Sequence, residues 1–192
     1  MKKLQKGFAL TELLIAVAVV ALIFAAIFSV YTQLTATTDG STLASQITAI
    51  QSTTREQFGR QRGRYATVAA EHIANSQRAP ADMITGLTPN GLVHVFGGDV
   101  EINPVAYSGV AGTGFEILIS GVPADACSAV LSRVEGMFGF IAVGSPAPAF
   151  SRTANVGGGV VKNMIVGDPM DQVLVINACN SSGLSDLRLA TN

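Results

Sequence analysis

One carboxylate precedes a long apolar run near the N-terminus. Glu12 is followed by Leu13 to Phe28, a stretch without a charged or polar side chain. An ionised acid in the hydrocarbon of a membrane costs on the order of 2.5–3.5 kcal/mol even on a mild insertion scale. An acid in this position therefore indicates a functional role, in which a partner of opposite charge offsets the penalty.

The other side chains capable of chemistry show no catalytic arrangement. His72 and His94 lack metal-ligand partners at familiar spacings, and no nucleophile elbow or phosphate-binding loop occurs. The two acids of Gly167–Asp171 flank a proline and are more typical of a turn than of a calcium site, which needs six or more oxygens. The 12 Lys and Arg against 13 Asp and Glu give no basic field for nucleic acid. We therefore expect neither an enzyme nor a cofactor or metal site.

The apolar run has the length of a membrane span. Leu13 to Tyr31 as a helix would be about 28 Å long, close to the roughly 30 Å hydrocarbon core. A cleaved secretory signal fits poorly, because the small residues Ala16-Val17-Ala18 lie inside the run. Lys2, Lys3 and Lys6 precede the run, which predicts a cytoplasmic N-terminus and an exported body.

The helix is expected to continue beyond the apolar run. Leu43, Ile47, Ile50 and Phe58 form a single stripe at helical spacing. A helix from Phe8 to Phe58 would be about 75 Å long, and Gly59 is a plausible stop. The threonines and glycine of Thr35–Gly40 predict a kink or a locally melted turn.

The rest of the chain predicts one α+β domain with an antiparallel sheet. Charged residues make up only 13% of the sequence, which suits a surface that packs against copies of itself. Arg60–Arg64 is a small basic cluster, interpreted as a solvated face. The expected elements are helices at 66–77 and 123–134, a turn at 87–91, a hairpin of strands 92–96 and 99–105, strands at 115–119, 138–143, 160–166 and 172–176, and a loop at 144–159.

Two cysteines, Cys127 and Cys179, lie far apart in the exported part. An even count in an oxidising compartment favours one disulfide over two buried thiols. The bridge would close a loop of about fifty residues and stabilise the fold by roughly 4 kcal/mol in the chain-entropy model.

The N-terminal motif resembles that of a known family. Gly7-Phe8, then Thr11-Glu12 and the apolar run, look like the class III signal of type IV prepilins and related pseudopilins. The resemblance implies that a prepilin peptidase cuts after Gly7 and methylates the new amino group of Phe8. It also implies that the Glu12 carboxylate pairs with the freed N-terminus of an adjacent subunit. The alternative is a signal-anchor with a chance glutamate.

The body resembles a subgroup of the same family. Phe96-Gly-Gly98, Gly121 to Cys127, and the late Cys179 are similar to the type IVb pilins of the thin-pilus and bundle-forming kind. In those proteins the two cysteines bridge and staple a variable C-terminal region. The short leader and Phe8 instead resemble type IVa precursors, so both subgroups stay open at this point.

The resemblance implies a pilin fold, a long N-terminal helix packed on an antiparallel sheet, in a filament subunit without enzymatic activity. The expected partners are the prepilin peptidase, copies of the chain in a helical homopolymer, and the inner-membrane pilus assembly machinery. The precursor would span the bacterial inner membrane before it joins an extracellular pilus. The expected parts are a leader at 1–7, an assembly half of the helix at 8–31, an amphipathic half at 32–58 and a head domain at 59–192.

Two alternatives remain beside a major pilin. One is a minor pilin or a type II secretion pseudopilin, and the other is a monomeric anchored binding or enzymatic domain. Adhesion, conjugation, motility and DNA uptake are not distinguished by the sequence.

Overall fold

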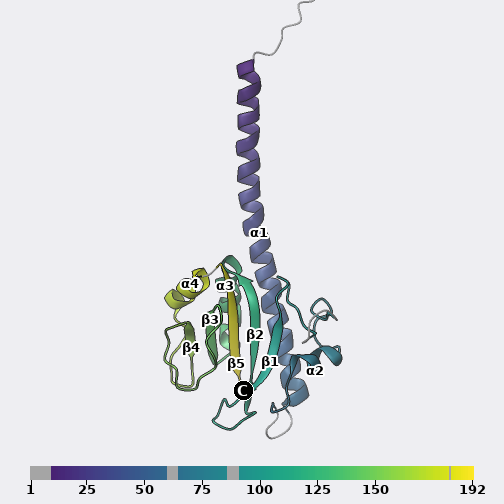
Figure 1. Cartoon of the computed structure of the whole chain (residues 1–192), viewed down its shortest axis with the longest axis vertical. Coiled ribbons are helices and arrows are strands. Elements are labelled where there is room, and N and C mark those ends of the chain that lie inside the picture. Colours follow the sequence, from purple (N-terminus) through teal and green to yellow (C-terminus); the bar gives the residue numbers. More distant parts are fainter. Residues whose placement is uncertain (1–9, 60–64, 86–90, 182) are drawn as a thin grey trace, which may run out of the picture. The chain divides into compact units, whose positions relative to one another are not determined.

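The chain forms two compact units, which are described separately. The computed structural model describes residues 10–59, 65–85, 91–181 and 183–192. Residues 1–36 make up the first unit and residues 37–192 the second, called the head from here on. Helix α1, Leu10–Phe58, supplies residues to both units (Figure 1).

Helix α1 agrees with the predicted long helix over its described length. It stays helical through Thr35–Gly40, so a locally melted turn, one of the two expected outcomes, is wrong. In the head part of this segment, the hydroxyls of Ser41 and Thr42 donate to the carbonyl of Thr38 at 2.7 and 3.2 Å. The helix ends at Phe58, where the amide of Gly59 donates to the Arg55 carbonyl at 2.8 Å.

The head contains a five-stranded sheet whose paired strands are all antiparallel. Its order is β1-β2-β5-β3-β4, so the strand latest in the sequence lies in the middle. The α+β class and the pilin-type arrangement of helix and sheet are therefore confirmed. The strands are β1 Val100–Val105, β2 Gly114–Pro123, β3 Phe140–Gly144, β4 Val160–Asn163 and β5 Leu184–Thr191.

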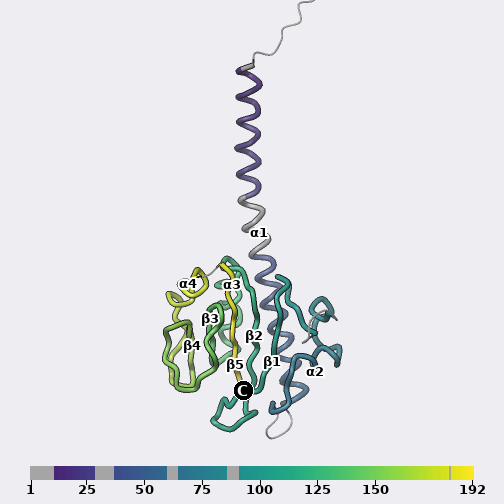
Figure 2. The backbone as a smooth tube through the Cα atoms, viewed as in Figure 1, coloured from purple at the N-terminus to yellow at the C-terminus, as the bar shows by residue number. Residues whose placement is uncertain are grey.

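One face of the sheet packs on helices. The stripe predicted from sequence is buried here, with Leu43, Ile47 and Ile50 at 1% exposure or less. The head part of α1 and helix α3, Ala124–Val134, lie behind the sheet in the view of Figure 2. Alternate residues of the strands face the helices and join this core: Phe115, Ile117 and Ile119 of β2, Ile141 and Val143 of β3, and Leu187 and Leu189 of β5.

The opposite face of the sheet carries a second, smaller core. Phe140, Ala142, Val160, Ala190 and Val105 form it, and partly buried side chains of two loops cover it. Those side chains are Tyr107, Phe150 and Ala154, and the Tyr107 and Phe150 rings stack at 5.8 Å. The segment 144–159, predicted as a loop, thus covers the outer face of the sheet.

The C-terminal third differs most from the sequence prediction. The expected strand at 172–176 is helix α4, Gln172–Asn180, because Asp171 caps it by accepting from the amides of Val173 and Leu174. Val175 and Cys179, four residues apart, form its buried side. Strand β5 was not predicted at all, although Leu187 and Leu189 alternate with Asp186 and Arg188.

The expected hairpin of 92–96 and 99–105 is present only as a short pairing. Val93 bridges Asp99, the Val100 amide donates to the Leu92 carbonyl and the His94 amide to the Gly98 carbonyl. Residues 100–105 form β1, whose partner along its length is β2. Helix α2, Ala70–Asn75, is shorter than the predicted 66–77, and β4 ends at Asn163 rather than 166. The helix predicted at 123–134 is α3, followed by the 3-10 turn Glu135–Met137. The basic cluster 60–64 and most of the turn at 87–91 lie outside the described residues.

Candidate assembly site

The first part of α1 leaves its apolar side chains uncovered by the chain itself. Thr11–Phe28 has a mean hydropathy of 2.7, and none of it is buried. Its large side chains are at least half exposed, from 50% for Val19 to 72% for Leu22. By length and composition this helix could cross a membrane. Its apolar surface is therefore available to lipid or to another protein.

Glu12 lies in the first turn of α1 and is exposed. It is the only charged residue between Thr11 and Phe28. The positive end of the helix dipole favours a carboxylate there by about 0.3–1 kcal/mol, which does not offset a membrane penalty of roughly 2.5–3.5 kcal/mol. Inside a membrane, Glu12 would need a further cationic partner to offset this penalty. The amino group expected to supply it is that of Phe8, freed by the cut after Gly7, and both residues lie outside the described residues.

The two cysteines are joined in the head. Cys127 of α3 and Cys179 of α4 form a disulfide with a Cα–Cα distance of 5.7 Å, and both residues are buried. The bridge spans 52 residues of sequence and encloses the segment that carries β3 and β4. The disulfide attaches α4 to α3. The other contacts of α4 with the main core come from Leu174, Val175 and Ala178.

Two buried glutamines on α1 connect the helix to distant loops, and the sequence analysis missed both. The Gln46 amide nitrogen donates to the Asp82 carboxylate at 2.6 Å, and its oxygen accepts from the Val95 amide at 3.2 Å. Gln51 donates to the Met137 carbonyl at 2.8 Å. The available signal was their position beside the apolar stripe of Ile47 and Ile50, where a polar side chain must find a buried partner.

The acids of Gly167–Asp171 serve local structure. Asp171 caps α4, and the Asp168 carboxylate accepts from the Val156 amide at 3.3 Å. Within the described part of the chain, no three His, Cys, Asp or Glu side chains gather to hold a metal ion. These carboxylates support the interpretation of the segment as a turn.

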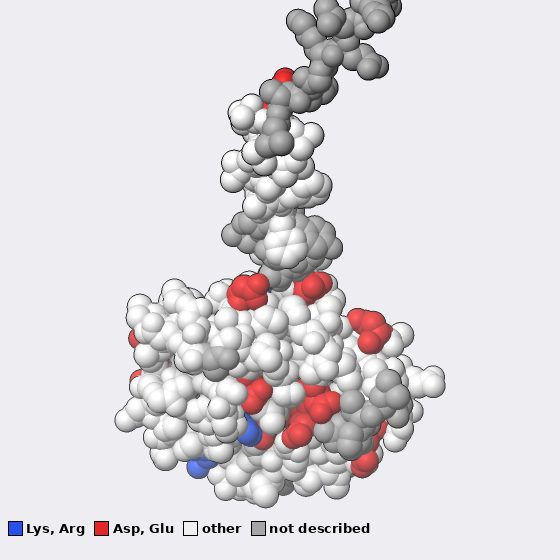
Figure 3. All heavy atoms as spheres, turned by 45° about the horizontal axis from the view of Figure 1, so that its top comes forward, with Lys and Arg blue, Asp and Glu red and all other residues white. Residues whose placement is uncertain are grey.

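On the face of the head shown in Figure 3, carboxylates are spread widely, and the visible Lys and Arg side chains lie toward its lower left. Among the cations, Arg188 and Lys162 are used internally: Arg188 pairs with Glu116, and Lys162 donates to the Glu135 carbonyl. Burial lowers the pKa of Lys162, while the nearby Glu135 carboxylate opposes that shift. Burial also raises the pKa of Tyr107.

A long N-terminal helix, an antiparallel sheet packed on its second half and a late disulfide together define a type IV pilin. Solved pilin structures have the same fold. One is TcpA, a type IV pilin from Vibrio cholerae El Tor biotype, with a TM-score of 0.60 and 18% identity over 81% of this chain and 99% of that chain. Another is the type IVb pilin from Salmonella typhi, with a TM-score of 0.52 and 17% identity over 81% and 96%. Comparison with curated proteins gave no match.

Two family models match the sequence, one over the N-terminal segment and one over most of the head. The model of the prokaryotic N-terminal methylation motif matches residues 2–28, and the model described as PilS N terminal matches residues 37–163. The chain belongs to this PilS N-terminal family. Of the two subgroups left open by the sequence, these matches support a type IVb pilin precursor.

Proposed function

We propose that this chain is the precursor of a structural subunit of a type IV pilus. The observation that carries the proposal is Glu12 at the start of a fully exposed apolar helix, in a chain whose head has the pilin fold. An exposed apolar surface of this length is stable only in lipid or against other copies of the helix. A pilin uses both environments in turn.

The N-terminal residues then have defined roles. A prepilin peptidase cuts between Gly7 and Phe8, and the amino group of Phe8 is methylated, in agreement with the match of the methylation motif to residues 2–28. The new N-terminus is a cation. Pairing it with Glu12 of a neighbouring subunit offsets the cost of both charges in an apolar filament centre.

Location follows from the same sequence of events. The precursor is anchored in the inner membrane by the 11–28 segment, with Lys2, Lys3 and Lys6 on the cytoplasmic side, and the head is exported. Inner-membrane assembly machinery then adds the processed subunit to an extracellular filament. The parts proposed are the leader 1–7, the assembly half of the helix 8–31, the amphipathic half 32–58 and the globular α+β domain 59–192.

The role of Glu12 is tested by Glu12→Gln, which removes the charge at nearly constant shape, and by Glu12→Ala. Both variants are expected to be cleaved and inserted into the membrane. They should yield at least about tenfold fewer sheared filaments, because losing an ion pair worth about 1.4 kcal/mol weakens subunit association tenfold. Electron microscopy counts the filaments, and mass spectrometry of the sheared band reads the N-terminus and the disulfide. Thr11→Ala is the matched control and is expected to assemble normally.

Two results would contradict the proposal. Normal numbers of filaments from both Glu12 variants would remove the pairing role. A wild-type chain that keeps its leader and never appears in the sheared fraction would remove the pilin function itself. A minor pilin or a secretion pseudopilin, the second candidate, is distinguished by abundance, because a major pilin dominates that fraction.

A further inference from the structure

A buried histidine lies at the base of a short turn on the edge of the head. His94 is 3% exposed, and the residues after it, Val95 to Gly98, turn back on themselves before β1. Its ring Nε2 lies 2.7 Å from the Ser120 carbonyl of β2. Its ring Nδ1 lies 3.2 Å from the backbone nitrogen of Phe96. Both ring nitrogens are thus engaged with backbone groups.

These two partners allow only one protonation state of the ring. The Ser120 carbonyl can only accept a hydrogen bond, so Nε2 carries the proton and donates to it. The Phe96 amide can only donate, so Nδ1 is bare and accepts. The ring is therefore the neutral Nε2–H tautomer. A second proton on Nδ1 would face the Phe96 N–H, and the accepting interaction would be lost.

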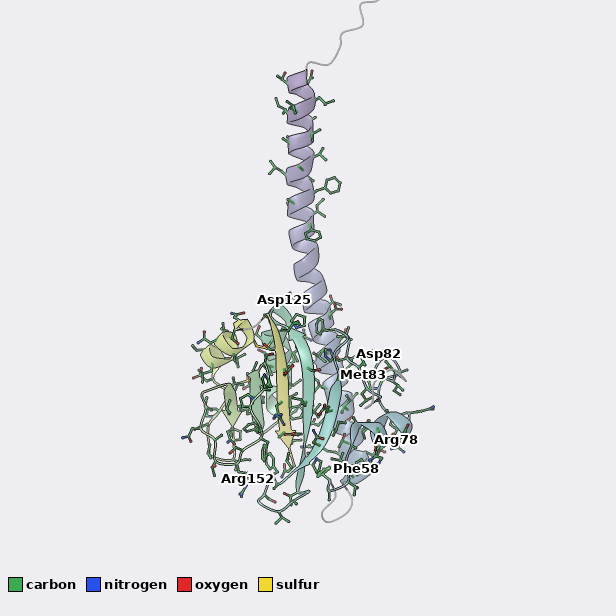
Figure 4. All side chains as sticks on the ribbon, viewed as in Figure 1. Phe58, Arg78, Asp82, Met83, Asp125 and Arg152 are labelled. Carbon is green, nitrogen blue, oxygen red and sulfur yellow. A yellow bond between two sulfur atoms is a disulfide. The ribbon has the colours of Figure 1, made fainter. Side chains whose placement is uncertain are left out.

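The turn has few other attachments. The Val95 amide donates to Gln46 of α1, whose other end donates to Asp82 (Figure 4 labels Asp82 and Met83 beside α1). Within the turn, the His94 amide donates to the Gly98 carbonyl at 3.0 Å. Gly98 is required by this arrangement, because a side chain there would run into the Ser120 carbonyl and His94 Nε2. The histidine ring thus connects the turn to the sheet, beside the hydrogen bonds between Asp99 and Ser120 that hold the end of the turn.

The charged groups around the ring are few among the described residues. Asp99, which follows the turn, favours protonation of His94 electrostatically, and Asp82 reaches the turn only through Gln46. Burial acts in the other direction and is the larger effect, so the pKa of His94 lies below its ordinary value of 6.5. The hydrogen bond to Ser120 and the charge of Asp99 oppose this shift without reversing it.

We infer that His94 is a pH-sensitive latch, which holds the turn Val95–Gly98 against the head when neutral and releases it when protonated. Opening lets the imidazolium reach water and frees Nδ1 from the Phe96 amide. It also uncovers Phe96, whose ring packs on His94 at 5.9 Å and contacts the main core. Mild acid therefore exposes a new apolar surface on this edge of the head.

The direction of the pH effect follows from proton linkage. Because the open turn binds a proton more readily than the closed one, closure is fully favoured above the ordinary histidine pKa of 6.5. Below that pH, the ratio of closed to open turn falls by up to about tenfold per pH unit. The fall stops at the pKa of His94 in the closed state.

Hydrogen exchange of the full chain in detergent micelles tests the latch. Protection of the backbone amides of Val95 and Phe96, corrected for intrinsic exchange, is measured between about pH 7.5 and about pH 5. We expect it to fall by up to about tenfold per unit below 6.5, while protection of Ile117 in β2 stays level. The carbon-13 shifts of the His94 ring should titrate over the same range.

Variants separate the latch from other causes. His72→Gln removes the exposed histidine and should leave the pH effect unchanged, whereas His94→Gln should abolish it. Asp99→Asn should leave the onset of the pH effect unchanged and make the loss of protection in acid larger, because it removes the charge that favours protonation of His94 in the closed state. The inference is overturned if wild-type protection at Val95 and Phe96 is independent of pH, or if Ile117 loses protection in parallel. Failure here leaves the pilin function untouched, because filament assembly is a separate measurement.

Discussion

Glu116 and Arg188 form an ion pair on the outer face of the sheet, largely withdrawn from water. The Arg188 guanidinium donates to Glu116 Oε1 at 2.5 Å, and the two side chains are 17% and 8% exposed. The other carboxylate oxygen of Glu116 and the Nε of Arg188 find no hydrogen-bond partner among the described residues. Such a pair adds little net stability, yet each partner depends on the other.

Removing one partner should therefore be far worse than removing both. Arg188→Met is expected to lower the free energy of unfolding by roughly 3–5 kcal/mol, since it leaves the Glu116 carboxylate buried and unpaired. The double variant Glu116→Leu/Arg188→Met should recover most of that loss. Urea unfolding followed by circular dichroism measures both.

The exposed pair of Arg78 and Glu56 provides the control. Its N–O distance is 3.1 Å, but both side chains are more than half exposed, so Arg78→Met should change stability by no more than about 1 kcal/mol. Equal losses from Arg188→Met and Arg78→Met would contradict the distinction between the buried and exposed pairs.

Individual residues differed in how far the sequence could predict them. The disulfide was predictable because only one intrachain pairing of two cysteines exists. The contacts of Gln46 and His94 were not, because their partners lie 49 and 26 residues away and are brought close only by the folded sheet. Sequence patterns report neighbours along the chain, and these contacts depend on the tertiary fold.

At the scale of elements, α4 depends on the Cys127–Cys179 bridge. Val173 and Ile176 of this helix are 65% and 52% exposed, and its buried contacts are concentrated around Val175 and Cys179. A helix of this length is marginal in isolation. The disulfide therefore restrains a weakly packed element.

Replacing both cysteines by alanine should lower the free energy of unfolding by about 2–5 kcal/mol, since the bridge restrains a long loop of the unfolded chain. It should also speed hydrogen exchange in α4 more than in α3, which is held by its own buried face of Val130, Leu131 and Val134. Exchange mass spectrometry compares the two helices. Equal protection of α4 in the variant and the wild type would show that packing alone holds it.

The errors in element prediction have two physical sources. The segment 172–176 is apolar and short, so its periodicity is ambiguous, and the Asp171 cap decides in favour of a helix. Strand β5 alternates apolar and polar residues as a strand with one buried face should. Its Asp186 and Arg188, however, lower the strand preference of the segment. The long helix α1 and the strand around Phe115–Ile119 were predictable, because an extended stripe or a clear alternation identifies them.

At the scale of the whole molecule, the head contains its own core. Every buried apolar residue of the described chain lies at position 43 or later, and the large exposed side chains of the first unit lie between 13 and 28. The core of the described head is therefore built from the head's own residues. The residues that form the core of the head, from position 43 onward, are thus distinct from the exposed apolar residues at 13–28.

A chain lacking residues 1–36 is expected to fold as a soluble monomer with the same sheet and disulfide. The matched control begins at residue 52 and also removes Leu43, Ile47 and Ile50, and it should fail to fold because the helical side of the core is missing. Circular dichroism and size-exclusion chromatography report the outcome. Aggregation of the longer fragment would show that the head needs the first unit.

The central position of β5 has a consequence for export. Strands β1 and β2 pair with each other, as do β3 and β4, but no pairing joins the two hairpins except through Leu184–Thr191. In the export proposed above, a chain that crosses the membrane from its N-terminal side would deliver two half-sheets with open edges before the strand that unites them arrives. Because Cys179 precedes β5, oxidation can close the bridge during this interval. The sheet of the head is therefore completed only when β5, the last strand to be translocated, pairs with β2 and β3.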